Sequence, residues 1–246
     1  MDRTHMEARM RRKTQQSGFT LVEIAIVLVI IGLLLGGILK GQELINSAKV
    51  KNLANDFRVV PTYIYAFQDK FKSLPGDDNN IASHVAGATL ASSPGAVGNG
   101  LIEGHWNSTT PTDESYLFWQ HVRMANLAAG STNPADVATY RPGNAVGSVL
   151  GISSVSTTIP TAAAQIANMS GSFQICSRSI PGKFALQLDV QMDDGEPCTG
   201  SMRAIPEVGA ATTAGVTPVK SAAPPAACTG GATIANDDLY TVCMTF

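Results

Sequence analysis

Hydrophobic residues dominate one uninterrupted stretch near the start of the chain. The 19 residues from Leu21 to Leu39 include 14 Leu, Ile and Val residues and a single charged residue, Glu23. As an α-helix at about 1.5 Å per residue, this stretch would be about 28 Å long, which matches a bilayer hydrocarbon core of about 30 Å. On an insertion scale, these aliphatic residues contribute about −0.3 to −0.6 kcal/mol each and outweigh one carboxylate that costs roughly 2.5 to 3.5 kcal/mol. The pattern therefore predicts a membrane-spanning helix.

After Lys40 the apolar residues become periodic. They recur three and four residues apart, which is the spacing of one helix face: Leu53, Phe57, Val60, Ile64, Phe67, Phe71 and Leu74. Pro75 and Gly76 then end the pattern, because proline has no N–H to donate and glycine accepts a positive φ. We therefore expect one continuous helix from Phe19 to about Leu74, with its second part packed on a globular domain.

The remaining residues, about 170 of them, are enough for one domain with its own core. A helix is predicted from Asp113 to about Leu127, and alternating residues predict strands over 172–178 and 238–246. Residues 184–192 fit both a strand and a helix, so the pattern leaves the two open. The ranges 81–111, 131–171 and 209–227 are rich in small and turn-forming residues and are predicted to be loops.

Charge predicts the orientation of the chain. Residues 1–18 carry a net charge of +3, and the rest of the chain carries −5. By the positive-inside rule, the basic end stays in the cytoplasm and the region beyond the apolar stretch is exported. No convincing signal-peptidase site follows the stretch at Leu39-Lys40-Gly41-Gln42. The acidic balance does not indicate nucleic acid as the main partner.

A specific motif stands where the apolar stretch begins. A short basic leader ends at Gly18 and is followed by Phe19, Thr20-Leu21-Val22, Glu23 and the apolar helix. This arrangement resembles the prepilin signature shared by type IV pilins and the pseudopilins of type II secretion. The resemblance implies cleavage between Gly18 and Phe19 by prepilin peptidase, N-methylation of Phe19, and pairing of Glu23 with the N-terminal ammonium of a neighbouring subunit. A buried acid and a buried amine each need the other. The alternative is an ordinary signal anchor in which the Glu is incidental.

The resemblance also implies an architecture. It is an α+β, pilin-like fold, in which a long N-terminal helix packs on a C-terminal domain with a small antiparallel sheet and extra loops and helices. The chain then divides into a leader (1–18), a transmembrane and filament-core helix (19–40), an amphipathic helix (41–74) and a globular domain (75–246). Further motifs resemble a subgroup of these proteins, and the last of them favours a helix over 184–192: Leu74-Pro75-Gly76-Asp77, Asn99-Gly100 with a nearby Glu, Phe118-Trp119-Gln120-His121, and the acidic segment from Leu188 to Gly200.

The four cysteines, Cys176, Cys198, Cys228 and Cys243, lie in the part expected to be exported, where disulfides form. Four cysteines allow three pairings. The resemblance favours Cys228 with Cys243, because pilin-like proteins often tie their C-terminal segment by such a loop, and leaves Cys176 with Cys198. Free buried thiols are the alternative. A zinc site is disfavoured, because no two cysteines stand two to four residues apart.

The sequence indicates no catalytic centre and no cofactor. Nucleophile-elbow, phosphate-loop and dinucleotide motifs are absent. His84, His105 and His121 match no ligand spacing. Asp189, Asp193 and Asp194 resemble the calcium sites of some pseudopilins, although they do not form the twelve-residue calcium loop, and turn formation or helix capping by Asp193 or Asp194 is the alternative. We therefore expect no metal, with these three aspartates as weak calcium candidates.

These features predict a structural subunit and not an enzyme. The resemblance implies a type IV pilus-like filament, built from this chain alone or mixed with related chains and serving adhesion, motility or DNA uptake. The partners that it implies are prepilin peptidase and an inner-membrane assembly platform with its ATPase. The subunit would cross the inner membrane once, with its N-terminus in the cytoplasm and its domain in the periplasm, before it enters the filament. The alternatives are a pseudopilin of a periplasmic secretion filament and a membrane-anchored enzyme.

Overall fold

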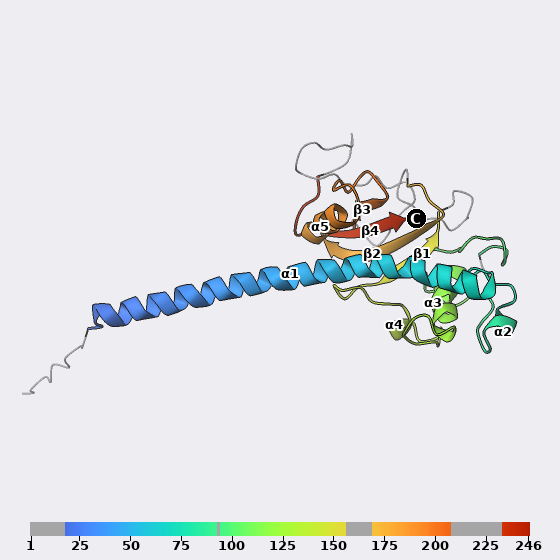
Figure 1. The fold of residues 1–246 in the computed structure, drawn as a ribbon, viewed down its shortest axis with the longest axis horizontal. Coiled ribbons are helices and arrows are strands. Elements are labelled where there is room, and N and C mark those ends of the chain that lie inside the picture. The colour runs from blue at the N-terminus through green and yellow to red at the C-terminus, as the bar shows by residue number, and fades with distance from the viewer. Residues whose placement is uncertain (1–17, 93, 156–168, 208–232) are drawn as a thin grey trace, which may run out of the picture. The chain divides into compact units, whose positions relative to one another are not determined.

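A computed structural model describes residues 18–92, 94–155, 169–207 and 233–246. The chain forms two compact units, residues 1–45 and 46–246. Helix α1 (Leu21–Phe71) begins in the first unit and ends in the second (Figure 1). The second unit contains a small antiparallel sheet with further helices. The prediction of an α+β, pilin-like fold is therefore confirmed.

In the first unit, α1 exposes its apolar side chains. None of the residues in its most apolar window is buried, and the helix is long and apolar enough to cross a membrane. Gly32, Gly36, Gly37 and Gly41 interrupt the larger side chains, and a Cβ placed on any of them would meet no atom within 4 Å. Such small residues allow a second helix to approach closely. This segment thus presents an apolar surface that the single chain leaves uncovered.

In the second unit, α1 buries one face. The buried residues follow the predicted spacing: Val50, Leu53, Ala54, Phe57, Val60, Ile64 and Phe67. The helix runs through Pro61 and ends at Phe71, three residues before the predicted end. Lys72 causes this earlier end, because it adopts a positive φ of 57° while its N–H donates to the carbonyl oxygen of Gln68 at 2.8 Å. A left-handed residue after the last turn commonly ends a helix.

The sheet of the described residues has four antiparallel strands in the order β1-β2-β4-β3. Their bounds are β1 (Leu150–Ser154), β2 (Phe173–Pro181), β3 (Met202–Pro206) and β4 (Leu239–Thr245). The C-terminal strand β4 is therefore central, paired with β2 on one side and β3 on the other. The strands predicted over 172–178 and 238–246 are confirmed as β2 and β4.

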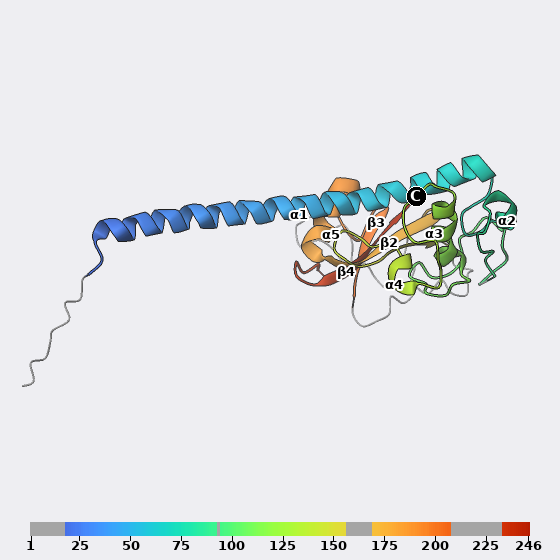
Figure 2. The ribbon, with the colours of Figure 1, turned by 90° about the horizontal axis from the view of Figure 1, so that it is seen from below.

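Two further helices complete the core of this unit. Helix α3 (Glu114–Met124) confirms the helix predicted from Asp113, and α5 (Gly182–Met192) resolves the open choice at 184–192 in favour of a helix. Figure 2 shows the sheet and α3 on the same side of the second part of α1. One cluster of buried side chains joins these elements, with Phe57 from α1, Phe118 from α3 and Leu188 from α5. The long helix is thus part of the core and not only an anchor.

Several short elements lie where no regular structure was predicted. Strand β1 and helix α4 (Val137–Tyr140) fall within 131–171, helix α2 (Ile81–His84) falls within 81–111, and β3 follows the acidic segment. In β1, a Cβ on Gly151 would overlap the carbonyl oxygen of Trp106, so the close approach of this backbone excludes a side chain. All five residues of β1 are buried, so its sequence shows no alternation of apolar and polar positions. The loop predicted over 209–227 lies outside the described residues.

The predicted disulfide pairing is wrong. Cys176 and Cys243 are bonded to each other across a sequence separation of 67 residues. They are direct partners in the register of β2 and β4, with their Cα atoms 4.0 Å apart, and both are fully buried. Strand pairing therefore brings these two cysteines together. Cys198 is also disulfide-bonded, and Cys228 lies outside the described residues.

Candidate functional site

The predicted processing site lies just before α1. Gly18, Phe19 and Thr20 precede the helix, and the side chain of Phe19 is 84% exposed. Residues 1–17 of the predicted leader lie outside the described residues. Proteases cut exposed segments outside regular structure. The bond between Gly18 and Phe19 is therefore accessible in the single chain.

Thr20 and Glu23 cap the first turn of α1. One carboxylate oxygen of Glu23, Oε2, accepts hydrogen bonds from the backbone N–H and the hydroxyl of Thr20, each at 2.8 Å. The N–H of Glu23 donates in return to Oγ1 of Thr20 at 3.2 Å. This reciprocal arrangement is a capping box. Glu23, the acid that the resemblance links to filament assembly, thus also caps its own helix. The ammonium group of a neighbouring subunit would have to share or replace these hydrogen bonds.

His121 connects the turn after α1 to α3. Its Nδ1 accepts a hydrogen bond from the N–H of Gly76 at 2.9 Å, and its Nε2 lies 2.8 Å from the carbonyl oxygen of Thr89. Because Nδ1 is the acceptor, Nε2 carries the proton. Burial lowers the pKa of His121 to about 4, so the ring is neutral. Two motifs that are distant in sequence, Leu-Pro-Gly-Asp and Phe-Trp-Gln-His, therefore meet here.

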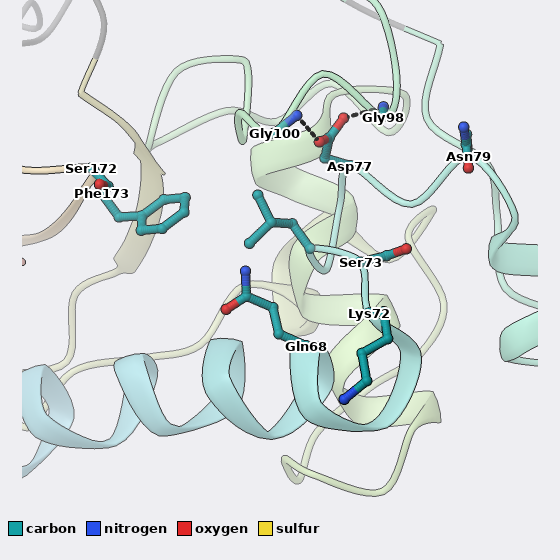
Figure 3. Close-up of a pocket in the computed structure, with 10 residues that line it drawn as sticks. Gln68, Lys72, Ser73, Asp77, Asn79, Gly98, Gly100, Ser172 and Phe173 are labelled. Carbon is teal, nitrogen blue, oxygen red and sulfur yellow. Dashed lines mark hydrogen bonds between the residues drawn. The ribbon is translucent and has the colours of Figure 1, made fainter.

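Asp77 binds the same turn to a loop. Its carboxylate accepts hydrogen bonds from the N–H groups of Gly98 and, at 2.7 Å, of Gly100 (Figure 3), and from that of Asn99 at 3.2 Å. Successive N–H groups directed at one carboxylate form a nest that stabilises negative charge. The acid of the Leu-Pro-Gly-Asp motif and the Asn99-Gly100 motif are thus two halves of one contact.

A pocket of about 390 Å³ lies beside this contact, as Figure 3 shows. It is lined by the end of α1, the turn after it, the 98–100 loop and the start of β2: Gln68, Lys72, Ser73, Leu74, Asp77, Asn79, Gly98, Gly100, Ser172 and Phe173. Its volume falls in the range of small-molecule sites, about 300 to 1,000 Å³. The pocket is therefore large enough for a small molecule and is lined by polar side chains such as Gln68, Lys72 and Asn79.

Two buried acids adjoin Asp77, and sequence reasoning missed their role. Glu114 begins α3, and its Oε2 accepts a hydrogen bond from the N–H of Glu103 at 2.7 Å. Burial and the nearby carboxyl groups of Asp77 and Glu103 raise the pKa of Glu114 to about 8. The only sequence signal was a Glu close to Asn99-Gly100. Burial of these carboxyl groups follows from tertiary packing, which no local pattern records.

The three calcium candidates gather at the C-terminal end of α5. Asp189, Asp193 and Asp194 each place one carboxylate oxygen within 4.8 Å of the others. Asp193 accepts the N–H of Met202 at 2.7 Å, and Asp194 accepts the N–H of Glu196 at 2.9 Å. These hydrogen bonds are the turn contacts that were expected of Asp193 and Asp194 as the alternative to calcium binding.

Asp189 differs from its two neighbours. It is 1% exposed, and neither of its carboxylate oxygens accepts a hydrogen bond of normal geometry from a described residue. Burial and the charges of Asp194 and Asp193 raise its pKa to about 8. Carboxylate oxygens suit hard cations, so the three side chains fit calcium, with carbonyl groups or water completing its six to eight ligands. Calcium binding stays a prediction.

Within the described part of the chain, His84, His105 and His121 do not gather into a cluster with metal-ligand spacing. Among the described residues, the aspartate group is the only set of three or more His, Cys, Asp or Glu side chains with metal-ligand spacing. His84 instead places Nδ1 2.6 Å from a carboxylate oxygen of buried Asp78, and His105 accepts the N–H of Asn107 at 2.9 Å. These rings serve local structure.

Comparison with known families supports the interpretation of the N-terminal segment. Residues 13–39 match the family model described as the prokaryotic N-terminal methylation motif. This motif is the prepilin-type cleavage and methylation signal of type IV pilins and pseudopilins. No curated protein and no solved structure matches the chain. The motif supports a place among these structural subunits, and it is common to pilins and pseudopilins.

Proposed function

We propose that this chain is a structural subunit of a type IV pilus-like filament, made as a prepilin, cleaved between Gly18 and Phe19 and polymerised through α1. The observation that carries the proposal is the coincidence of the prepilin-type signal with a helix whose apolar residues, Leu21 to Leu39, are exposed in the single chain. Continuous apolar surface of this kind requires lipid or protein to cover it. The bilayer covers it first, and the helices of other subunits cover it later.

Assembly would exchange lipid contacts for helix contacts. Cleavage creates an ammonium group at Phe19, and Glu23 of a neighbouring subunit is the acid available to pair with it inside an apolar core. Gly32 and Gly36 leave space for close helix approach. The work of extraction comes from outside the chain, through an inner-membrane platform and its cytoplasmic ATPase. The filament contains this chain alone or together with related chains.

A pseudopilin of type II secretion is the second candidate, because the same signal occurs in both groups. It would form a short periplasmic filament, and its deletion would stop protein export. A membrane-anchored enzyme is less well supported, since the prepilin-type signal is that of structural subunits. Location and the effect of deletion therefore separate the candidates.

The test is mass spectrometry of the N-terminus, in cells with and without prepilin peptidase. Material sheared from the cell surface and membrane fractions are analysed separately. We expect a peptide that starts with N-methylated Phe19 in both fractions, only when the peptidase is present. The same peptide in membranes but never in sheared material would favour the pseudopilin. An intact leader in peptidase-competent cells would overturn both candidates.

A pair of glycine variants locates the cut. Gly18→Val places a β-branched side chain at the cleaved bond and is expected to keep the leader. Gly41→Ala lies beyond the apolar stretch and is expected to be processed normally. A Cβ at either position would meet no atom within 4 Å, so neither change disturbs the fold of the chain. Equal processing of the two variants would contradict cleavage at Gly18.

A further inference from the structure

Three carboxyl groups lie buried together where the turn after α1 meets α3. Asp77 is 3% exposed, Glu103 is 7% exposed and Glu114 is 1% exposed. Within the described part of the chain, no Lys, Arg or His forms an ion pair with any of the three. Buried carboxylates without a cation are costly when all of them are ionised. The arrangement therefore requires at least one proton.

The hydrogen bonds indicate which group carries that proton. The side chain of Asp77 lies close enough to Glu114 for their carboxyl groups to share a hydrogen bond. Two ionised carboxylates are both acceptors, so such a bond forms only when one of them is protonated. Asp77 already accepts three N–H groups, from Gly98, Asn99 and Gly100, so its carboxylate oxygens have donors without a proton of their own.

Glu114 has the opposite environment. It accepts one N–H, from Glu103, and its second oxygen, Oε1, has no acceptor bond within the described residues. A proton on Oε1 would satisfy this oxygen and supply the donor for the bond to Asp77. The proton therefore belongs on Glu114.

We propose that Glu114 is a proton-binding site that couples docking of the 98–103 loop to pH. The loop is held at two points, since Asp77 accepts the N–H groups of residues 98–100 and Glu114 accepts the N–H of Glu103. Ionised Glu114 loses its bond to Asp77 and repels the carboxylates on both sides. Because Gly98 and Gly100 line the pocket beside Asp77, release of the loop would also open that pocket.

The charged side chains that act on Glu114 raise its pKa. Asp77 faces it from the turn after α1 and Glu103 from the loop, and both are acids that raise its pKa. Asp113 precedes it in the chain, and His121, further along α3, is held neutral by burial. The pKa of about 8 lies above the ordinary value near 4.5. The contribution of Glu114 to stability is thus present below pH 4.5 and is lost as pH rises to 8.

The experiment uses the full chain in detergent micelles. Carbon-13 NMR of the glutamate carboxyl groups is expected to show Glu114 titrating near pH 8. Amide hydrogen exchange at residues 98–100, corrected for its intrinsic pH dependence, should accelerate above that pH. In Glu114→Gln, the amide can donate to Asp77 and accept from Glu103 at every pH. This variant should therefore lose the acceleration and show a smaller fall in Tm between pH 5 and 9.

Glu43→Gln is the matched control, because Glu43 is an exposed carboxylate on α1, and it should behave like the unchanged chain. Titration of Glu114 near pH 4.5 would overturn the proposal, and so would equal exchange at alkaline pH in the unchanged chain and in Glu114→Gln. If Glu114→Gln does not fold, the NMR titration of the unchanged chain decides the question alone.

Discussion

The backbone N–H of Gly76 donates a hydrogen bond to Nδ1 of His121, which lies 45 residues later in the chain and 2.9 Å away. This bond attaches the turn that ends α1 to the last turn of α3. The other ring nitrogen of His121 bonds to Thr89, and the ring stacks on Phe67 with 6.4 Å between centroids. One neutral imidazole therefore connects a helix, a turn and a loop.

Acid is expected to destabilise the globular unit through His121. Its pKa is about 4 in the folded chain, below the ordinary value of 6.5, because burial disfavours the charged ring. The unfolded chain takes up the proton first, so stability present above pH 6.5 is lost as pH falls towards 4. His121→Gln cannot bind this proton and should show a shallower fall in Tm over that window. If Tm falls equally with pH in the unchanged chain and in His121→Gln, the ring of His121 is not held neutral by burial.

Two glycines with positive φ are expected to differ in their tolerance of alanine. Gly76 has a φ of 95°, and a Cβ there would lie 2.5 Å from the carbonyl oxygen of Glu114. Gly100 has a φ of 83° and no atom within 4 Å of such a Cβ. Each substitution costs about 1 to 2 kcal/mol of backbone strain. Gly76→Ala should cost about 1 to 3 kcal/mol more, because it forces the turn away from α3. Thermal unfolding of the two variants measures the difference. Equal losses of stability would contradict the extra steric cost at Gly76, because both variants would then show only the backbone strain that they share.

Loss of the disulfide between Cys176 and Cys243 is expected to destabilise the sheet strongly. Closing a loop across 67 residues is worth about 4 kcal/mol in the chain-entropy account. Cys176→Ser and Cys243→Ser should each lose an amount of this order. The double variant should lose little more, since the bond is already absent in either single variant. Peptide mapping without reductant should recover Cys176 linked to Cys243, and a peptide joining Cys243 to Cys228 would refute the pairing.

Variants of Thr20 and Glu23 are expected to distinguish the role of Glu23 in helix capping from its role in filament assembly. Thr20→Ala removes the hydroxyl partner of Glu23, which costs the helix end about 1 kcal/mol, but it leaves the acid in place. Glu23→Gln keeps a polar group that can still accept from the N–H of Thr20, but it removes the charge. Filaments should therefore form with Thr20→Ala and fail with Glu23→Gln, while both chains lose their leader. Electron microscopy of sheared material reports assembly, and filaments from Glu23→Gln would contradict the proposed pairing.

Asp193 is expected to stabilise its turn whether or not calcium is present. It accepts the N–H of Met202 and so holds the end of α5 against the start of β3. Asp193→Ala should lower the free energy of unfolding by about 1 to 3 kcal/mol in the presence of a chelator, because it leaves a buried N–H without an acceptor. A calcium-dependent rise in Tm that is present in the unchanged chain and absent from Asp189→Asn would assign a metal to the cluster. No such rise would leave the aspartates with their turn contacts alone.

The sequence by itself determined the elements whose signal is local. The spacing of Leu53, Phe57 and Val60 records a helix face, and α1 buries that face along the predicted line. Alternation likewise located β2 and β4, and capping and turn signals located α3. The prepilin-type signal at residues 13–39 is a contiguous motif, so its residues identify it without any tertiary contact.

Only the tertiary structure decided the features that depend on which segments meet. Strand β1 became visible through its pairing with β2 and the contact of Gly151 with Trp106, because its own residues do not alternate. The bond between Cys176 and Cys243 follows from the register of β2 and β4. The proton that we propose on Glu114 likewise depends on burial of its side chain beside other carboxyl groups. Periodicity records which way a residue faces within its own element, whereas register and burial arise from partners tens of residues away.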